Sequence, residues 1–406
     1  MTAALSPEGR ALLATVSAPD PRAALEVRLG PETSWATLLH LAGSELVSAP
    51  VLEGLADAAA RAGAPMEARQ SFLRLARVVD FRQARVAQLL EGVLDLLADH
   101  GIEAVVLKGA ALAATAYPAF RDRPMRDIDL LLGGGEEALE ARELLLEAGW
   151  TWDRERMPDA MYRDHYHLPP LDEPAGTGLG LELHTGLFVR GHPFGLTGGA
   201  LRDSAVGAKW RVRKLFVPEP TFHLVYVCTH YAWPHGLRSG TWRALRDVQA
   251  LSTLPGHDWS RFMEIARDGR CASCCFWALR LARDLGGVGV PEDVLEALSS
   301  GLPRPLLPFL ERAVAAGALP EGPSCPTPGA RHVLWTAAIR PGRQGHGHVR
   351  PWMYDERFRS LVPEPEPAPA YRRAARRLGR WLRYLARLAG WGTRGRASFR
   401  AAGRPR

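Results

Sequence analysis

The period of the hydrophobic pattern changes twice along this chain, and no other feature constrains the possible folds as strongly. Residues 34–100 place apolar side chains at three- and four-residue steps, which is the spacing of amphipathic helices. Short apolar or alternating runs follow at 104–107, 127–132 and 179–187, and these are typical of strands. The helical spacing returns from residue 220 to about residue 317. We therefore predict an α+β fold, with a small sheet between an N-terminal and a C-terminal helical region.

The same changes divide the chain into five segments. We expect an N-terminal helical region, a domain that carries the sheet, a helical domain, a linker and a basic amphipathic tail, at residues 1–100, 101–217, 218–340, 341–370 and 371–406. The tail holds twelve Arg and no acid, which leaves the other 370 residues at −5 although the whole chain carries +7. We expect any contact with RNA or anionic lipid to be weak and to belong to the tail. A solvated or packed terminal helix is the other interpretation of this segment.

Targeting and thiol features favour a cytoplasmic protein. The first twenty residues contain Glu8 and Arg10 and no apolar block, unlike a secretory signal. No apolar stretch approaches the roughly 18–20 residues of a membrane span. The five cysteines are odd in number and unevenly placed, as expected of reduced thiols. The pair Cys271 and Cys274 has no second pair nearby to complete a zinc site, so we expect core cysteines there.

Two aspartates occupy an otherwise apolar run at residues 126–132, Arg-Asp-Ile-Asp-Leu-Leu-Leu. In a strand, Asp127 and Asp129 project to the same side while Ile128 and Leu130 project into the core. Two carboxylates at this spacing repel each other, and a divalent cation such as Mg²⁺ removes that cost. The pair therefore indicates a metal site, although an exposed edge strand with an acidic polar face would show the same pattern.

Upstream of this pair, basic residues and a glycine suit a triphosphate. Lys108 is one of only three Lys among 51 basic side chains, and it is followed by Gly109 between a predicted strand and a predicted helix. A glycine there lets the backbone approach a phosphate at the helix N-terminus, and Lys108 would add a compact point charge. Arg123 and Arg126 lie in the loop before the aspartates and could form charge-assisted contacts with phosphate. A lysine that only extends from a strand end to solvent is the alternative for Lys108.

A third carboxylate lies on the third predicted strand, at residues 179–187. Leu181 and Leu183 face the core there, so Glu182 and His184 share the polar face. With Asp127 and Asp129, Glu182 would complete a two-metal site for an in-line displacement. The other histidines lack zinc-ligand spacing, and we expect ordinary polar roles for them.

These motifs together resemble a known family. Leu-Lys-Gly at 107–109, Arg-Pro-Met-Arg-Asp-Ile-Asp at 123–129 and Glu-Leu-His at 182–184 look like the uncharacterised nucleotidyltransferase family of the DNA polymerase β-like superfamily. The segments 222–230 and 245–259 resemble its helical part, and the resemblance covers roughly residues 60–300.

The resemblance implies a mixed sheet that carries the metal-binding acids in a catalytic domain at 101–217. It also implies transfer of a nucleoside monophosphate from an NTP, with two Mg²⁺ ions and loss of pyrophosphate. One departure is notable: the superfamily commonly has Gly-Ser or Gly-Gly in its first motif, whereas this chain has Lys108-Gly109-Ala110.

We therefore expect a Mg²⁺-dependent nucleotidyltransferase whose acceptor is a hydroxyl or amine of a small molecule or a peptide. Asp127, Asp129 and Glu182 would be the catalytic metal ligands. A catalytically silent nucleotide-binding regulatory protein is the alternative, although such a protein has no reason to keep three repelling carboxylates. A nucleic-acid-binding module led by the tail is a third possibility, disfavoured by the acidic body. Asp247 could anchor Arg243 or Arg246, or line the acceptor pocket.

Overall fold

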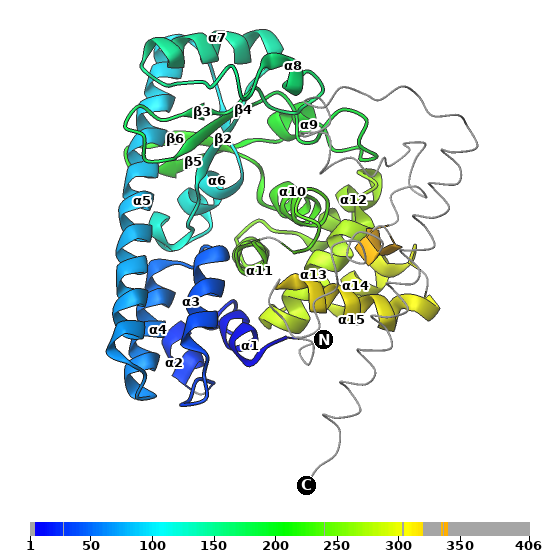
Figure 1. Ribbon diagram of the computed structural model, residues 1–406. Helices are drawn as coiled ribbons and strands as arrows, with labels where there is room; N and C mark the ends of the chain where they lie inside the picture. Colours follow the sequence, from blue (N-terminus) through cyan, green and yellow to red (C-terminus); the bar gives the residue numbers. More distant parts are fainter. Residues whose placement is uncertain are drawn as a thin grey trace, which may run out of the picture.

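The three strand-like runs of the sequence pair with three further strands into one six-stranded mixed sheet in the computed structural model (Figure 1). The structure describes residues 5–26, 28–238, 240–302, 304–319, 334–335 and 337–339. The strands are β1 (Val105–Val106), β2 (Asp127–Leu131), β3 (Leu171–Asp172), β4 (Gly180–His184), β5 (Val206–Trp210) and β6 (Arg213–Val217). Their order is β3-β4-β2-β1-β6-β5. β2 pairs parallel with β4 and β1 parallel with β6, and the other pairs are antiparallel. The predicted α+β class with helices around a small sheet is confirmed.

A long helix, α5 (Met66–Asp99), joins the N-terminal helices to the sheet. Figure 1 shows it running down one whole side of the molecule. Phe72 lies in the core shared with the N-terminal helices, whereas Val86 and Leu90 lie in a second core against the sheet. Because the apolar stripe of α5 continues through both cores, it fixes the two parts against each other. The preceding helices are α1 (Pro7–Leu13), α2 (Pro21–Glu26), α3 (Trp35–Ser44) and α4 (Ala49–Arg61).

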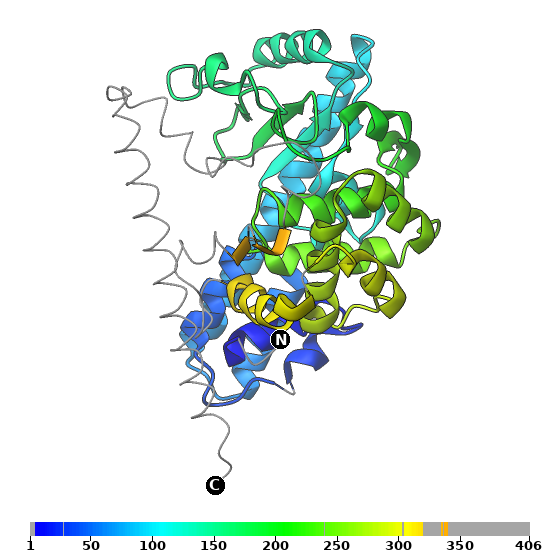
Figure 2. The ribbon, with the colours of Figure 1, turned by 90° about the vertical axis from the view of Figure 1, so that its right-hand side faces the viewer.

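Helices cover both faces of the sheet. Within the sheet-bearing part, the helices are α6 (Lys108–Thr115), the 3-10 turn η2 (Phe120–Asp122), α7 (Gly135–Glu147), α8 (Asp159–Tyr162) and α9 (Gly198–Asp203). The C-terminal helices are α10 (Pro220–Ala232), α11 (Thr241–Ser252), α12 (Trp259–Asp268), α13 (Ala272–Gly286), α14 (Glu292–Ser299), the turn η3 (Arg304–Leu306) and α15 (Leu307–Ala318). α7 and α10 lie on opposite sides of the sheet in both views (Figures 1 and 2). α10 is buried along nearly its whole length because α11, α12 and α13 all pack on it.

Some elements differ from the sequence-based expectation. The hairpin of β5 and β6 was not anticipated, and neither were α8 and β3 within residues 153–178. Cys271 and Cys274 are fully buried free thiols, as expected of core cysteines. The predicted linker and basic tail, residues 341–406, lie outside the described residues. Among the described helices, none combines the length and the apolar character that crossing a bilayer requires.

Candidate active site

Parallel pairing of β2 with β4 brings the predicted acids together. Asp129 lies opposite Glu182 in the register, and Asp127 lies opposite Gly180. Ile128 and its neighbours on the other face join the core with α5 and α7, whereas Leu131, on the acid-bearing face, joins the core with α10. The carboxylates therefore face the C-terminal helices, as strand alternation requires.

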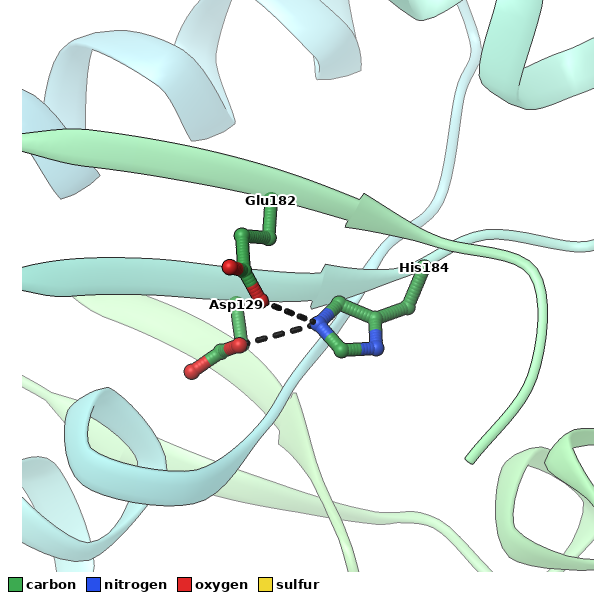
Figure 3. Close-up of side chains that lie close together, drawn as sticks. All are labelled: Asp129, Glu182 and His184. Atoms are coloured by element: carbon green, nitrogen blue, oxygen red, sulfur yellow. Dashed lines mark hydrogen bonds and ion pairs between the residues drawn. The ribbon is translucent and has the colours of Figure 1, made fainter. Parts of the chain in front are cut away.

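Two cationic groups contact these carboxylates. The Lys108 ammonium donates to Asp129 Oδ1 at 2.7 Å and lies 3.7 Å from Glu182 Oε2. His184 Nε2 lies 2.9 Å from the same Asp129 oxygen and 3.4 Å from Glu182 Oε2 (Figure 3). Asp129 and His184 are fully buried, so neither is screened by water.

Hydrogen bonding decides the charge of His184. Its Nδ1 faces the carbonyl oxygen of Gly186 at 3.4 Å, while Nε2 faces two carboxylates. Burial and the Lys108 charge lower the pKa of His184, but its hydrogen bonds to Asp129 and Glu182 outweigh them and raise it. Burial likewise opposes the charge of Lys108, but Asp129 raises the pKa of Lys108 well above its ordinary value. The neighbouring acids therefore favour the protonated forms of Lys108 and His184.

Glu182 is ionised, and His167 beside it is neutral. Burial would raise the pKa of Glu182, but His167, His184 and Lys108 hold it well below its usual range. His167 Nε2 lies 3.6 Å from Glu182 Oε2, and burial lowers the pKa of His167 to about 4. Because His167 is neutral at pH 7, the Lys108 charge and the hydrogen bond from His184 are what stabilise the Glu182 carboxylate there.

Asp127 lies at the open end of the acidic face. Its side chain is exposed, yet the surrounding atoms desolvate the carboxyl and, together with the charges of Asp129 and Glu182, raise its pKa to about 6. Carboxylates that share one face of the sheet suit a divalent cation, because oxygen ligands are those that Mg²⁺ prefers. One ligand atom from each of Asp129, Glu182 and His184 lies within 4.8 Å of the others, so the donor set fits a cation. An imidazole suits Mg²⁺ poorly, and His184 fits better as a hydrogen-bond partner of the acids.

The backbone at Lys108 is strained. Lys108 is the first residue of α6 and has a positive φ of 45°, a conformation that costs a non-glycine residue about 1–3 kcal/mol. The preceding amide, of Leu107, donates to the carbonyl of Asp129 at 2.9 Å, which ties the start of α6 to β2. Gly109 follows, and a Cβ there would meet Arg123 Nη1 and Met125 Cβ, both at 3.3 Å. The observed close approach at Gly109 is thus to the 123–125 segment, and its contact with phosphate stays a prediction.

Arg123 is buried in an ion pair. Its Nε and Nη2 donate to the two oxygens of Asp247 at 2.6 and 2.7 Å, and its Nη1 donates to the carbonyl of Pro124 at 2.7 Å. Tyr117 also donates to Asp247, at 2.7 Å. The expectation that Asp247 anchors Arg243 or Arg246 is wrong, because its partners come from the segment before β2. The nucleotide contact of Arg123 stays a prediction that requires exchange of Asp247 for phosphate, and Arg126 is exposed at the start of β2.

Helix α10 contributes Tyr226, which the sequence analysis missed, and His230, for which it expected an ordinary polar role. The Tyr226 hydroxyl is buried without a hydrogen-bond partner among the described residues. Burial raises the pKa of Tyr226, and the nearby Lys108 charge opposes this. One turn later, burial and the same Lys108 charge lower the pKa of His230. The i, i+4 spacing of Tyr226 and His230 was the signal that could have found them, since it places both on one helix face.

Comparison with known proteins agrees with this site. The family model described as "Uncharacterised nucleotidyltransferase" matches residues 31–287, a span that contains all six strands and every residue of the acidic site. No curated protein and no solved structure matches the chain. Because the family model covers well over half of the sequence, the chain belongs to the uncharacterised nucleotidyltransferase family.

Proposed function

We propose that this protein is a Mg²⁺-dependent nucleotidyltransferase that moves a nucleoside monophosphate from an NTP to a hydroxyl or amine of a small molecule or a peptide. The observation that carries the proposal is the shared face of Asp127, Asp129 and Glu182 on two parallel strands. Membership of the family supports nucleotidyl transfer in general.

Each residue of the acidic face has a defined task in this proposal. Asp127, Asp129 and Glu182 would hold Mg²⁺, which when bound supplies positive charge to the triphosphate and to the attacking and leaving oxygens. Glu182 would also orient the acceptor group or accept its proton, because its carboxylate is the one ionised beside the neutral His167. His184 holds the Asp129 and Glu182 carboxylates in place through Nε2.

The contact between Lys108 and Asp129 is compatible with two candidate functions. Its ammonium, 2.7 Å from Asp129, neutralises the acids and could turn to a phosphate when a metal ion binds. The same contact favours the second candidate function, a catalytically silent nucleotide-binding protein in which the lysine stands permanently in place of a metal ion.

A single experiment separates the two candidates. The protein and its Asp129→Asn variant would be titrated with each NTP in Mg²⁺ and in EDTA, and incubated with labelled NTP and a cell extract. The transferase is expected to bind NTP better with Mg²⁺, to lose this difference in the variant, and to label an acceptor at a rate that falls about 10²–10³-fold in the variant. NTP binding that is equal with and without metal, together with no labelled product, would support the silent protein instead.

A further inference from the structure

A guanidinium on α11 has no partner in the described part of the chain. Arg243 makes no ion pair or hydrogen bond with any described residue, and its Nε is buried and unpaired. Arg246 on the same helix also has a buried, unpaired Nε, but its Nη1 donates to the carbonyl of Val16 at 2.9 Å and its guanidinium lies over the Tyr117 ring. A partly buried and unpaired charge costs folding free energy, so such a charge calls for a ligand.

The position of Arg243 follows from its neighbour one turn along the helix. Arg243 and Asp247 are four residues apart and therefore share a face of α11. Asp247 holds Arg123, which precedes Asp127 by four residues, so this face is pinned against the start of β2. The Arg243 guanidinium packs over Gly240, where a Cβ would lie 2.7 Å from Nη2. The face of α11 that carries Arg243 is thereby turned toward the segment that leads into Asp127.

The electrostatics agree with that placement. Burial and the Arg123 charge lower the pKa of Arg243 to about 10, and the charge of Asp127 opposes this shift. Of the other nearby acids, Asp247 is held by Arg123 and Tyr117. Glu45 accepts from the Trp242 amide at 2.8 Å and, because burial raises its pKa to about 7, carries only part of a charge at neutral pH.

We propose that Arg243 binds the phosphate chain of the nucleoside triphosphate, a role that rests on the nucleotidyltransferase function proposed above. A triphosphate that contacts Mg²⁺ bound to the carboxylates is longer than the metal site. The part of the phosphate chain that lies beyond the metal site needs positive charge. The planar fork of an arginine forms two parallel hydrogen bonds to phosphate oxygens. Arg243 supplies this fork beside Asp127, where the acidic face opens to solvent.

The test uses the full-length protein and inorganic tripolyphosphate with Mg²⁺, a probe that does not depend on the preferred base. Arg243→Met removes the guanidinium but keeps much of the apolar stem, and we expect it to weaken tripolyphosphate and ATP binding roughly 10- to 150-fold by calorimetry. Arg243→Lys keeps the charge without the planar guanidinium, and its affinity should lie between those of the wild type and Arg243→Met. The control is Arg267→Met on α12, an exposed arginine whose loss should change affinity by less than roughly twofold.

Thermal unfolding of the ligand-free protein provides a second measurement. Because the guanidinium has no described partner, Arg243→Met should leave the melting temperature unchanged or raise it. A lower melting temperature would show a structural role and overturn the inference. If the wild type binds tripolyphosphate and Arg243→Met binds it with the same affinity, this inference alone is overturned and the proposed function stands. A wild-type protein that binds neither tripolyphosphate nor any NTP would overturn both.

Discussion

The buried pair of Arg123 and Asp247 should be the most sensitive polar contact between the sheet and the C-terminal helices. Asp247 is 3% exposed and accepts hydrogen bonds from Arg123 at 2.6 and 2.7 Å and from Tyr117 at 2.7 Å. Asp247→Ala leaves a buried guanidinium whose remaining contact is the carbonyl of Pro124. Breaking a buried pair in this way costs about 3–5 kcal/mol of unfolding free energy.

Removing Arg123 instead of Asp247 should cost less unfolding free energy. Arg123→Met leaves the Asp247 carboxylate with the Tyr117 hydroxyl as a donor, and a methionine follows much of the arginine stem. The double variant Arg123→Met/Asp247→Ala removes both charges, so its loss should be smaller than that of Asp247→Ala alone. We therefore expect the two single losses to exceed the double loss by about 2 kcal/mol or more.

Urea unfolding followed by tryptophan fluorescence measures these differences, since the chain contains 12 Trp. The control is Asp164→Ala, which breaks an exposed pair with Arg190 whose side chains are 71% and 82% accessible, and which should cost less than about 1 kcal/mol. Single losses that add to the double loss within about 0.5 kcal/mol would refute the coupling.

Two further predictions concern buried charges. Burial raises the pKa of Glu45 from 4.5 to about 7, so the folded state holds its proton more tightly and stability falls as pH rises through this window. Between pH 5 and pH 8 the wild type should lose about 3 kcal/mol of unfolding free energy through this group, and Glu45→Gln should not. Urea unfolding of both proteins at the two pH values measures this, and an equal pH dependence in Glu45→Gln would contradict the prediction. Lys108→Ala should tighten Mg²⁺ binding to the nucleotide-free protein, because the ammonium 2.7 Å from Asp129 no longer competes. Calorimetry that gives equal Mg²⁺ affinities for Lys108→Ala and wild type would contradict that competition.

Local periodicity determined the parts of the site that lie within one element. The two-residue repeat of a strand places Asp127 and Asp129 on one face, and also Glu182 and His184, whatever the rest of the fold does. Three consecutive glycines at 133–135 indicate where β2 ends, and the apolar run before Lys108 indicates the position of β1. The long helix was also predictable, because its apolar steps continue over 34 residues.

Short elements with mixed polarity escaped the sequence analysis. The strands β5 and β6 hold only five residues each, include both remaining lysines, and meet at a turn where Arg211 has a positive φ of 53°. No Asn-Gly or Asp-Gly pair marks that turn. Their strand character comes from pairing beside β1, which is a long-range contact.

Tertiary structure alone decided which charges meet. Asp129 and Glu182 are 53 positions apart and become neighbours only because β2 and β4 pair in parallel. The guanidinium of Arg123 is chemically suited to bind phosphate, yet it is bound by the carboxylate of Asp247, 124 residues away. Arg243 differs from Arg246 only in what surrounds it. Charge and residue type are local properties of a chain, whereas burial and pairing depend on the folded neighbours, and these determine whether a guanidinium stabilises the fold or remains available to a ligand.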